Sequence, residues 1–203
     1  MGPNESALIE RAKSGDNAAF GELMRLHDRR LIQVCHGIMG NMQDAYDAYQ
    51  EGIIRAYTHL DTFRYESAFG TWVTRIVINQ SLNLKKKMRW RSMVSFDMLQ
   101  SEGPLPTELQ DTHEADELTI NAELSREIAS SMDLLSDRER SVFILKHQHG
   151  YKLREIAKMI GCAEGTVKNY LFRATRKVRS ALAGFAPADT ATAVIEASSE
   201  RPN

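Results

Sequence analysis

The stretch that decides the fold is residues 134–182, LLSDRERSVFILKHQHGYKLREIAKMIGCAEGTVKNYLFRATRKVRSAL. Ser136 followed three residues later by Glu139 is a capping box, which predicts that a helix begins here. His149 and Gly150 end that helix, and a second apolar period runs on to Gly161. A third helix then carries the apolar stripe Val167, Leu171, Ala174, Val178 and Leu182. The stretch predicts a helix-turn-helix preceded by a supporting helix.

The surface opposite that stripe is basic. A helix fits the major groove of DNA, where Asn169 and Arg173 could make bidentate base contacts and Lys168 could reach a phosphate or guanine. A solvated face on an ordinary three-helix bundle would carry the same charges, so the helix alone leaves both interpretations open. The capped helix, the glycine-centred turn and the basic helix together favour DNA binding. The basic surface consists of Lys168, Asn169, Arg173, Arg176, Lys177 and Arg179.

The charge distribution says more than the total. The chain has 203 residues, 42% of them hydrophobic and 26% charged, with a net charge of −1. This length buries one sizeable core or two small ones. Residues 67–91 hold six Lys or Arg and no acid, whereas residues 92–125 hold eight acids and no Lys or Arg. The pattern predicts two blocks that face nucleic acid, separated by a segment that nucleic acid repels.

Metal, disulfide and membrane chemistry have little support. The two cysteines, Cys35 and Cys162, lie far apart and form no CxxC motif, so we expect two small buried apolar side chains. Cys35 and His36 with His27 lack further partners at the usual spacing, so we expect no metal and no cofactor. No apolar run is long enough to cross a bilayer and no signal peptide is visible. We therefore expect a cytoplasmic protein without membrane insertion.

The N-terminal part is predicted to be scaffold followed by an acidic helix. Residues 5–40 are typical of two helices, broken at residues 14–16 and ended by Gly40. Residues 43–60 predict a further helix whose buried stripe is Ile53, Ile54, Tyr57 and Leu60. Its outer face could be solvated or could dock on a basic protein surface, and we favour the solvated interpretation from this helix alone. That face carries Asp44, Asp47, Gln50 and Glu51.

A polar and aromatic turn at residues 61–67 precedes another helix, which begins near Ala68. Phe69 and Trp72 are expected in the core. The remaining residues suit single-stranded DNA, because bases stack on rings while cations follow phosphates. The turn supplies Arg64, Tyr65, Glu66 and Ser67, and the helix supplies Arg75, Asn79, Lys85, Lys86 and Lys87.

We therefore predict an all-α fold with two small helical domains joined by a flexible acidic linker. The first domain covers residues 1–91 and the helix-turn-helix domain covers residues 126–183. Residues 92–125 lack a sustained period and form the linker, apart from a helix that begins near Glu117. Residues 184–203 form a tail that we expect to be disordered.

Taken together, these stretches resemble the extracytoplasmic-function group of bacterial sigma factors. DAYDAYQEGIIRAY looks like the helix that binds the clamp helices of the largest subunit of core RNA polymerase. TFRYESAFGTWVTRIVINQSLNLKKK looks like the segment that melts and reads the −10 element. The stretch quoted first looks like the domain that reads the −35 element and contacts the flap of the second-largest subunit. The three stretches occur in the family's order and spacing.

The resemblance implies a role for each set of residues, without any catalysis. Asp44, Asp47, Gln50 and Glu51 would face the polymerase clamp. The 64–67 loop would capture a flipped base, while Arg75, Asn79 and residues 85–87 hold the strand. Family members are commonly held by an anti-sigma factor, which adds a further partner. Those facing the −35 groove would be Glu164, Thr166, Lys168, Asn169, Phe172 and Arg173, with Arg176 and Lys177 on the same basic helix.

Two other interpretations stay open at this stage. A stand-alone helix-turn-helix repressor would dimerise on a palindromic site, but it gives the acidic helix and the 64–87 block no role. An enzyme with a DNA-binding appendage would need a nucleophile, a metal set or a phosphate loop within residues 1–125, and we find no such motif there. The repressor interpretation predicts DNA binding without polymerase, and the enzyme interpretation predicts turnover of a substrate without polymerase.

Overall fold

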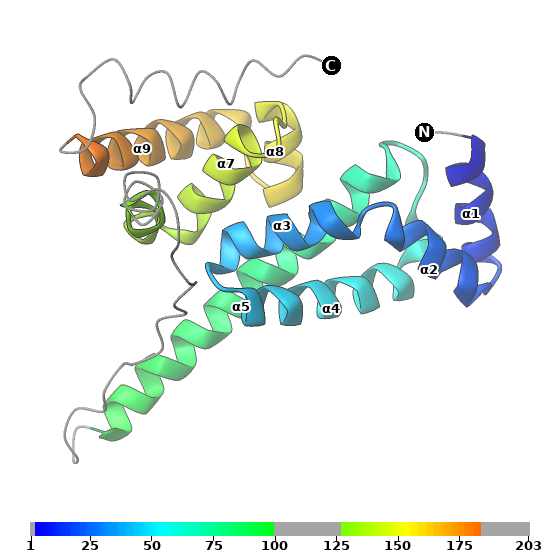
Figure 1. The fold of residues 1–203 in the computed structure, drawn as a ribbon, viewed down its shortest axis with the longest axis horizontal. Helices are drawn as coiled ribbons and strands as arrows, with labels where there is room; N and C mark the ends of the chain where they lie inside the picture. Colours follow the sequence, from blue (N-terminus) through cyan, green and yellow to red (C-terminus); the bar gives the residue numbers. More distant parts are fainter. Residues whose placement is uncertain (1–2, 100–126, 184–203) are drawn as a thin grey trace, which may run out of the picture.

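The computed structural model describes residues 3–99 and 127–183, and within these ranges every regular element is helical, as predicted (Figure 1). The N-terminal unit contains α1 (Pro3–Lys13), α2 (Asn17–Arg25), α3 (Asp28–Met39), α4 (Met42–Thr58), the short 3-10 helix η1 (Leu60–Thr62) and α5 (Phe69–Leu99). The C-terminal unit contains a helical segment at residues 127–133, followed by α7 (Asp137–His147), α8 (Leu153–Ile160) and α9 (Glu164–Leu182).

The first part of the chain forms three helices, so the prediction of two helices over residues 5–40 is wrong. The predicted break at residues 14–16 is confirmed, and Asp16 caps α2 by accepting a 3.0 Å hydrogen bond from the Ala19 amide. A second break separates α2 from α3 at Leu26 and His27, both of which keep right-handed backbone angles. Because neither Gly nor Pro marks this turn, the sequence pattern gave no signal for it.

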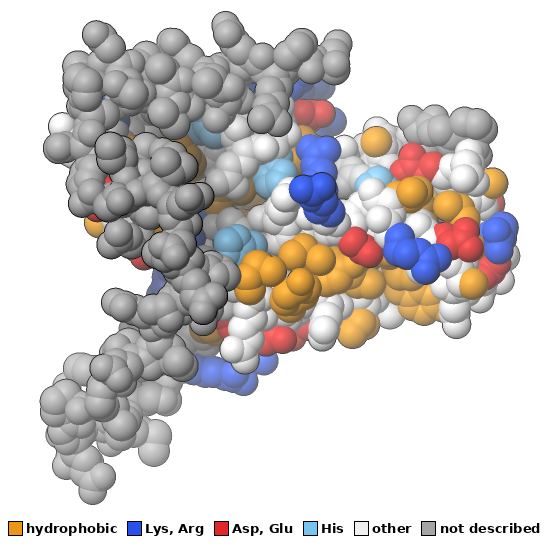
Figure 2. Space-filling view, viewed as in Figure 1, with side chains coloured by type: hydrophobic (Ala, Val, Ile, Leu, Met, Phe, Trp, Pro, Cys, Tyr) orange, Lys and Arg blue, Asp and Glu red, His pale blue; other side chains and the backbone are white. Residues whose placement is uncertain are grey.

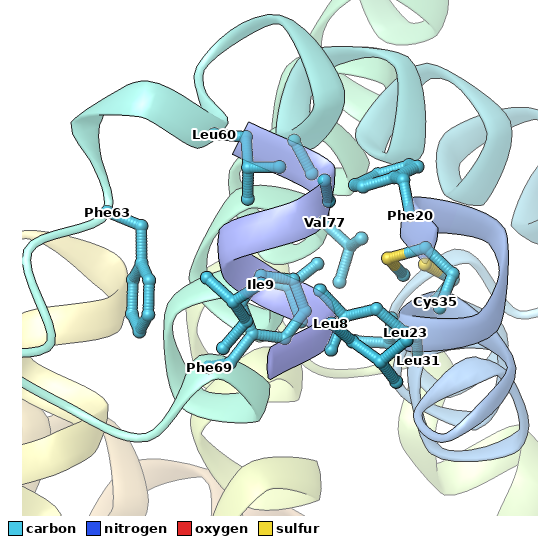
Figure 3. Close-up of a cluster of buried hydrophobic side chains, with 14 of the residues drawn as sticks. Leu8, Ile9, Phe20, Leu23, Leu31, Cys35, Leu60, Phe63, Phe69 and Val77 are labelled. Carbon is cyan, nitrogen blue, oxygen red and sulfur yellow. The ribbon is translucent and has the colours of Figure 1, made fainter. Parts of the chain in front are cut away.

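The N-terminal core gathers buried side chains from α1, α2, α3 and α5 (Figure 3), and α4 adds small residues to it. Small residues allow α4 to approach its neighbours, and a Cβ atom added at Gly52 would lie 2.7 Å from Val77 Cγ1. The predicted stripe is therefore partly wrong, since Ile54 is 65% exposed and Tyr57 is 42% exposed. Ile54 and Tyr57 lie outside the stripe of small residues by which α4 packs against its neighbours. The buried positions of α4 are Ala45, Ala48, Gly52 and Ala56.

The predicted helix-turn-helix is confirmed in its local detail. Ser136 Oγ accepts from the Glu139 amide at 3.3 Å, and Glu139 Oε2 accepts from the Ser136 amide at 2.9 Å, so the capping box is complete. Gly161 ends α8 with a positive φ of 68°, the left-handed conformation that glycine adopts readily. The chain then turns directly into α9, whose Val167, Ala174 and Val178 are buried.

The two units pack against each other through α3 and α5 on one side and α7 and α8 on the other (Figure 1). Gly37 permits a close approach of α3 and α7, since a Cβ atom there would lie 2.9 Å from Ile144 Cδ1. The buried Arg140 guanidinium crosses the seam and donates to the Gly37 carbonyl at 2.7 Å. One apolar cluster spans both units and includes Val34, Ile38, Ile78, Val142, Leu145 and Ile156.

The helix α5 continues to Leu99, past the boundary predicted at residue 91, and extends away from the body of the molecule (Figure 1). The first residues of the predicted linker are therefore helical. The remainder of that linker, the helix predicted near Glu117 and the tail predicted at residues 184–203 lie outside the described residues.

Candidate functional site

The predicted site residues fall on three exposed surfaces. We call the first the acidic face of α4, and it consists of Asp44, Asp47, Gln50 and Glu51. The second is the capture loop, residues 64–67, together with the basic strip of α5 formed by Arg75, Asn79, Lys85, Lys86 and Lys87. The third is the recognition face of α9, formed by Glu164, Thr166, Lys168, Asn169, Phe172, Arg173 and Arg176.

The acidic face of α4 is open to solvent at Asp47, Gln50 and Glu51, whereas Asp44 is half-buried. Asp44 belongs to the start of the helix, because Asn41 Nδ2 donates to its carboxylate at 2.7 Å and Asn41 Oδ1 accepts from its amide. Exposed Tyr46 and Ile54 lie on the same helix. In Figure 2, hydrophobic side chains gather over the region of α3 and α4 with acidic side chains beside them. Such a mixed surface is suited to a protein partner.

All four residues of the capture loop are exposed, as predicted. The loop is anchored to α1, since the Tyr65 hydroxyl donates to Glu10 Oε1 at 2.5 Å and Lys13 Nζ lies 4.9 Å from the centre of the Tyr65 ring. Partial desolvation and the hydrogen bond to Glu10 raise the pKa of Tyr65 to about 12. The phenol therefore stays protonated and continues to donate at neutral pH.

Below the loop, aromatic rings connect it to the core. The Phe63 ring centre lies 4.8 Å from that of Tyr65 and 5.4 Å from that of Trp72. Phe69 is fully buried and Trp72 packs against the same cluster, which confirms both as core residues. The exposed loop thus sits on a base of buried and half-buried aromatic rings.

The residues of the basic strip of α5 differ in their exposure, because the C-terminal unit packs against part of this helix. Arg75, Lys86 and Lys87 are exposed, while Asn79 and Lys85 are half-buried. Burial and the charge of Arg140 lower the pKa of Lys85, with Asp137 opposing them. Lys85 Nζ lies 3.7 Å from Asp137 Oδ1, so an acid of the C-terminal unit faces this end of the strip.

The recognition face of α9 is exposed except at Thr166, which is half-buried, and Phe172 is 67% exposed. Lys168 Nζ lies 3.4 Å from the Glu164 carboxylate one turn earlier. Lys177 points elsewhere: its ammonium donates to Glu139 Oε2 at 2.7 Å and to the Leu134 carbonyl at 3.1 Å. Although burial acts against it, this ion pair and the bonds from Ser136 lower the pKa of Glu139. The structure thus places Lys177 at the contact of α9 with α7.

Sequence reasoning did not identify the residues that join these surfaces. The Arg30 guanidinium lies 4.6 Å from the Tyr151 ring centre, and the Tyr151 hydroxyl donates to Thr74 Oγ1 at 3.3 Å. Glu10 and Lys13 were likewise assigned to scaffold. No motif marks these residues, because their role depends on segments far apart in the chain.

Among residues 3–99 and 127–183, no three or more His, Cys, Asp or Glu side chains lie close enough together to hold a metal ion. Cys35 is buried, and this burial raises the pKa of the thiol to about 11. Cys162 is half-buried. None of the helices in these ranges is long and apolar enough to cross a membrane.

The three surfaces define a helical protein with a helix-turn-helix unit and a separate unit that carries an aromatic and basic loop. Two family models match these units: Sigma-70 region 2 over residues 23–91 and Sigma-70 region 4 over residues 125–178. The chain belongs to the extracytoplasmic-function (ECF) sigma factors.

Curated relatives agree over most of the chain. The ECF RNA polymerase sigma factor SigW of Bacillus subtilis is 27% identical over 185 residues, which cover 86% of this chain and 94% of SigW. The sigma-E factor of Haemophilus influenzae is 27% identical over 179 residues, 87% of this chain and 94% of that protein. SigM of Mycobacterium tuberculosis is 28% identical over 176 residues, 86% of this chain and 83% of SigM.

Solved structures share the fold. Sigma factor RpoE from Bartonella quintana, in complex with the anti-sigma factor NepR, aligns with a TM-score of 0.61 at 21% identity, covering 81% of this chain and 96% of that one. CnrH in complex with the cytosolic domain of CnrY aligns with a TM-score of 0.61 at 23% identity, and the alignment covers 89% of this chain and 98% of that one.

Proposed function

We propose that this chain is an alternative sigma factor that binds core RNA polymerase and directs initiation at promoters with a specific −10 and −35 element. The observation that carries the proposal is that most residues of the three predicted surfaces are exposed, on two units that match sigma regions 2 and 4 in the family's order. The chain supplies recognition and strand opening, and the polymerase supplies catalysis.

In this proposal the N-terminal unit, residues 1–91, binds polymerase and opens the −10 element. The acidic face of α4 contacts the clamp helices of the largest subunit, where Asp47 and Glu51 meet basic side chains and Tyr46 and Ile54 add apolar area. The capture loop holds a base flipped out of the non-template strand. Stacking on an aromatic ring is worth about 1–3 kcal/mol per base, which is enough to retain an unpaired nucleotide.

The C-terminal unit, residues 126–183, fixes the position of the complex on the −35 duplex and contacts the flap of the second-largest subunit. Asn169 and Arg173 lie one turn apart on the exposed face of α9, within its first ten residues, and a recognition helix reaches base edges from its N-terminal part. Exposed Phe172 suits an apolar contact such as a thymine methyl group. Arg176 follows one turn later and suits a phosphate.

Two expectations accompany this function. A factor that works with polymerase on chromosomal promoters acts in the cytoplasm. We also propose an anti-sigma factor as a partner, because one structural neighbour is such a complex and the acidic and apolar surface of α4 offers a place for it.

The test is binding of purified core bacterial RNA polymerase, followed by run-off transcription on a promoter library randomised at both elements. We expect stable binding and transcripts that share one −35/−10 pair. Asp47→Arg with Glu51→Arg should abolish polymerase binding, while Arg173→Ala should keep polymerase binding and lose the −35 preference. A dimeric footprint on palindromic duplex without polymerase would establish the repressor instead, and turnover of a nucleotide by the purified chain would establish an enzyme.

A further inference from the structure

The first helix holds the capture loop through a set of contacts that join its side chains to Tyr65. The Tyr65 hydroxyl donates to Glu10 Oε1 at 2.5 Å, and Lys13 Nζ lies 4.9 Å from the Tyr65 ring centre. Lys13 also donates to the Phe63 carbonyl at 2.8 Å and lies 3.9 Å from Glu10. One acid and one base of α1 thus bind the Tyr65 ring and the backbone of Phe63, the residue that precedes the loop.

These contacts act on a backbone that does not favour its own conformation. Tyr65 has a φ of 60°, and it is the one non-glycine residue with a positive φ among the described residues. A bulky side chain rarely adopts this region, so the surrounding contacts have to maintain it. The conformation turns the Tyr65 side chain toward α1, where Glu10 and Lys13 bind it.

The ring held in this way remains accessible. Tyr65 is 42% exposed, while Phe63 directly beneath it is buried at 2% exposure. The two ring centres are 4.8 Å apart, and Phe63 packs in turn on Phe69 and Trp72. Tyr65 is therefore the outermost ring of a cluster of tilted and edge-on aromatic rings that continues into the core.

We infer that Glu10 and Lys13 are positioning residues for base capture: they hold Tyr65 as a preformed wall against which the flipped base stacks. The inference rests on the proposed function. A wall already in place saves the free energy of ordering the loop when the base arrives. It also fixes the distance between the ring and the polar side chains of Arg64 and Ser67. Base selection then depends on α1, a helix that does not itself touch the base.

The test compares conservative variants of the full chain. Glu10→Gln keeps the size of the side chain and weakens acceptance from the phenol, and Tyr65→Phe keeps the ring and removes the donor. Glu22→Gln, at an exposed position on α2, removes the same charge as a control. Two readouts are used: trypsin cleavage after Arg64, followed by mass spectrometry, and base preference at each −10 position in the promoter library with core polymerase.

We expect Glu10→Gln and Tyr65→Phe each to accelerate cleavage after Arg64 and to reduce the base preference at one −10 position, by about two- to tenfold, the range for one net hydrogen bond. The double variant should be no worse than Tyr65→Phe alone, because both substitutions act on the same hydrogen bond. Glu22→Gln should change neither readout.

The outcomes separate the two proposals. Unchanged cleavage after Arg64 in both variants would show that the anchor does not hold the loop, whatever the polymerase does. Faster cleavage with an unchanged base preference would limit Glu10 to a structural role and overturn the inference. If the wild-type chain binds no polymerase, the proposed function fails and the positioning role fails with it, while the cleavage data still report whether α1 anchors the loop.

Discussion

Asp137 at the start of α7 lies 2.6 Å from Arg89 Nη2 and 3.7 Å from Lys85 Nζ, so the C-terminal unit places a carboxylate on the basic end of α5. If the basic strip of α5 binds a DNA strand as proposed, Asp137 competes with the DNA phosphates for Lys85 and Arg89.

Asp137→Asn is therefore expected to strengthen binding of the isolated chain to single-stranded DNA. Each cation that gains a phosphate should steepen the dependence of log K on log salt by about 0.7. Fluorescence anisotropy with an oligonucleotide across a salt series measures this slope. Glu22→Gln makes the same change in net charge away from α5, and an equal effect from it would reduce the result to a change in total charge.

Arg173→Ala is expected to reduce the discrimination between bases at one base pair of the −35 element by about 1–3 kcal/mol, the value of a bidentate base contact. Arg176→Ala, one turn further along α9, should weaken all promoters alike, as the loss of a phosphate contact does. Transcription from a −35 library with core polymerase distinguishes them. A uniform loss with Arg173→Ala would instead make Arg173 a phosphate contact.

The free energy of unfolding is expected to decrease as the pH is lowered, because His149 takes up a proton less readily in the folded chain than in the unfolded one. Burial and the nearby Arg30 charge lower its pKa to about 4, and its Nε2 is buried without a hydrogen-bond partner among the described residues. The unfolded chain binds a proton near pH 6.5 and the folded one near pH 4. The loss therefore develops between these values and amounts to at most about 3 kcal/mol.

Urea denaturation at a series of pH values measures this effect. His149→Gln should flatten the curve between pH 6.5 and 4, whereas His36→Gln, at an exposed position, should leave it as in the wild type. An unchanged slope in His149→Gln would assign the pH dependence to other groups.

Lys152→Ser is expected to stabilise the C-terminal unit by about 1 kcal/mol, because Ser at a helix N-cap accepts from the backbone. At present only half of a capping box is present at α8: Glu155 Oε2 accepts from the Lys152 amide at 2.8 Å. A lysine side chain has no acceptor to complete it. Thermal unfolding followed by circular dichroism measures the change, and Lys158→Ser, a substitution of the same type within α8, should not stabilise.

Local signals in the sequence predicted much of the fold. Ser136 with Glu139, Asp16 and Gly161 each mark a helix end through chemistry within a few residues, and all three predictions are confirmed. The turn at Leu26 and His27 has no such marker. Ile54 was assigned to the core because periodicity gives no information on how closely a neighbouring helix approaches.

The candidate surfaces were predictable in outline for the same reason. Arg173 and Tyr65 are exposed where the pattern placed them, and their binding roles stay predictions. Lys177 shows the limit, because its charge suits DNA while its partner Glu139 lies on another helix. Pairs such as Tyr65 with Glu10 join residues far apart in sequence, so only the folded chain brings them together.

The apolar seam between α3 and α7 bears on how the protein can be divided. Beside the contact of Gly37 with Ile144, one apolar cluster takes Val34 and Ile38 from α3 and Val142 and Leu145 from α7, so that neither unit completes it alone. Cutting the chain within residues 100–126 would give two fragments, each with an exposed apolar surface that the other fragment normally covers. We expect the two fragments to co-purify as a complex and to precipitate when separated. The fragment that carries α9 should therefore stay in solution only when it is bound to the N-terminal fragment.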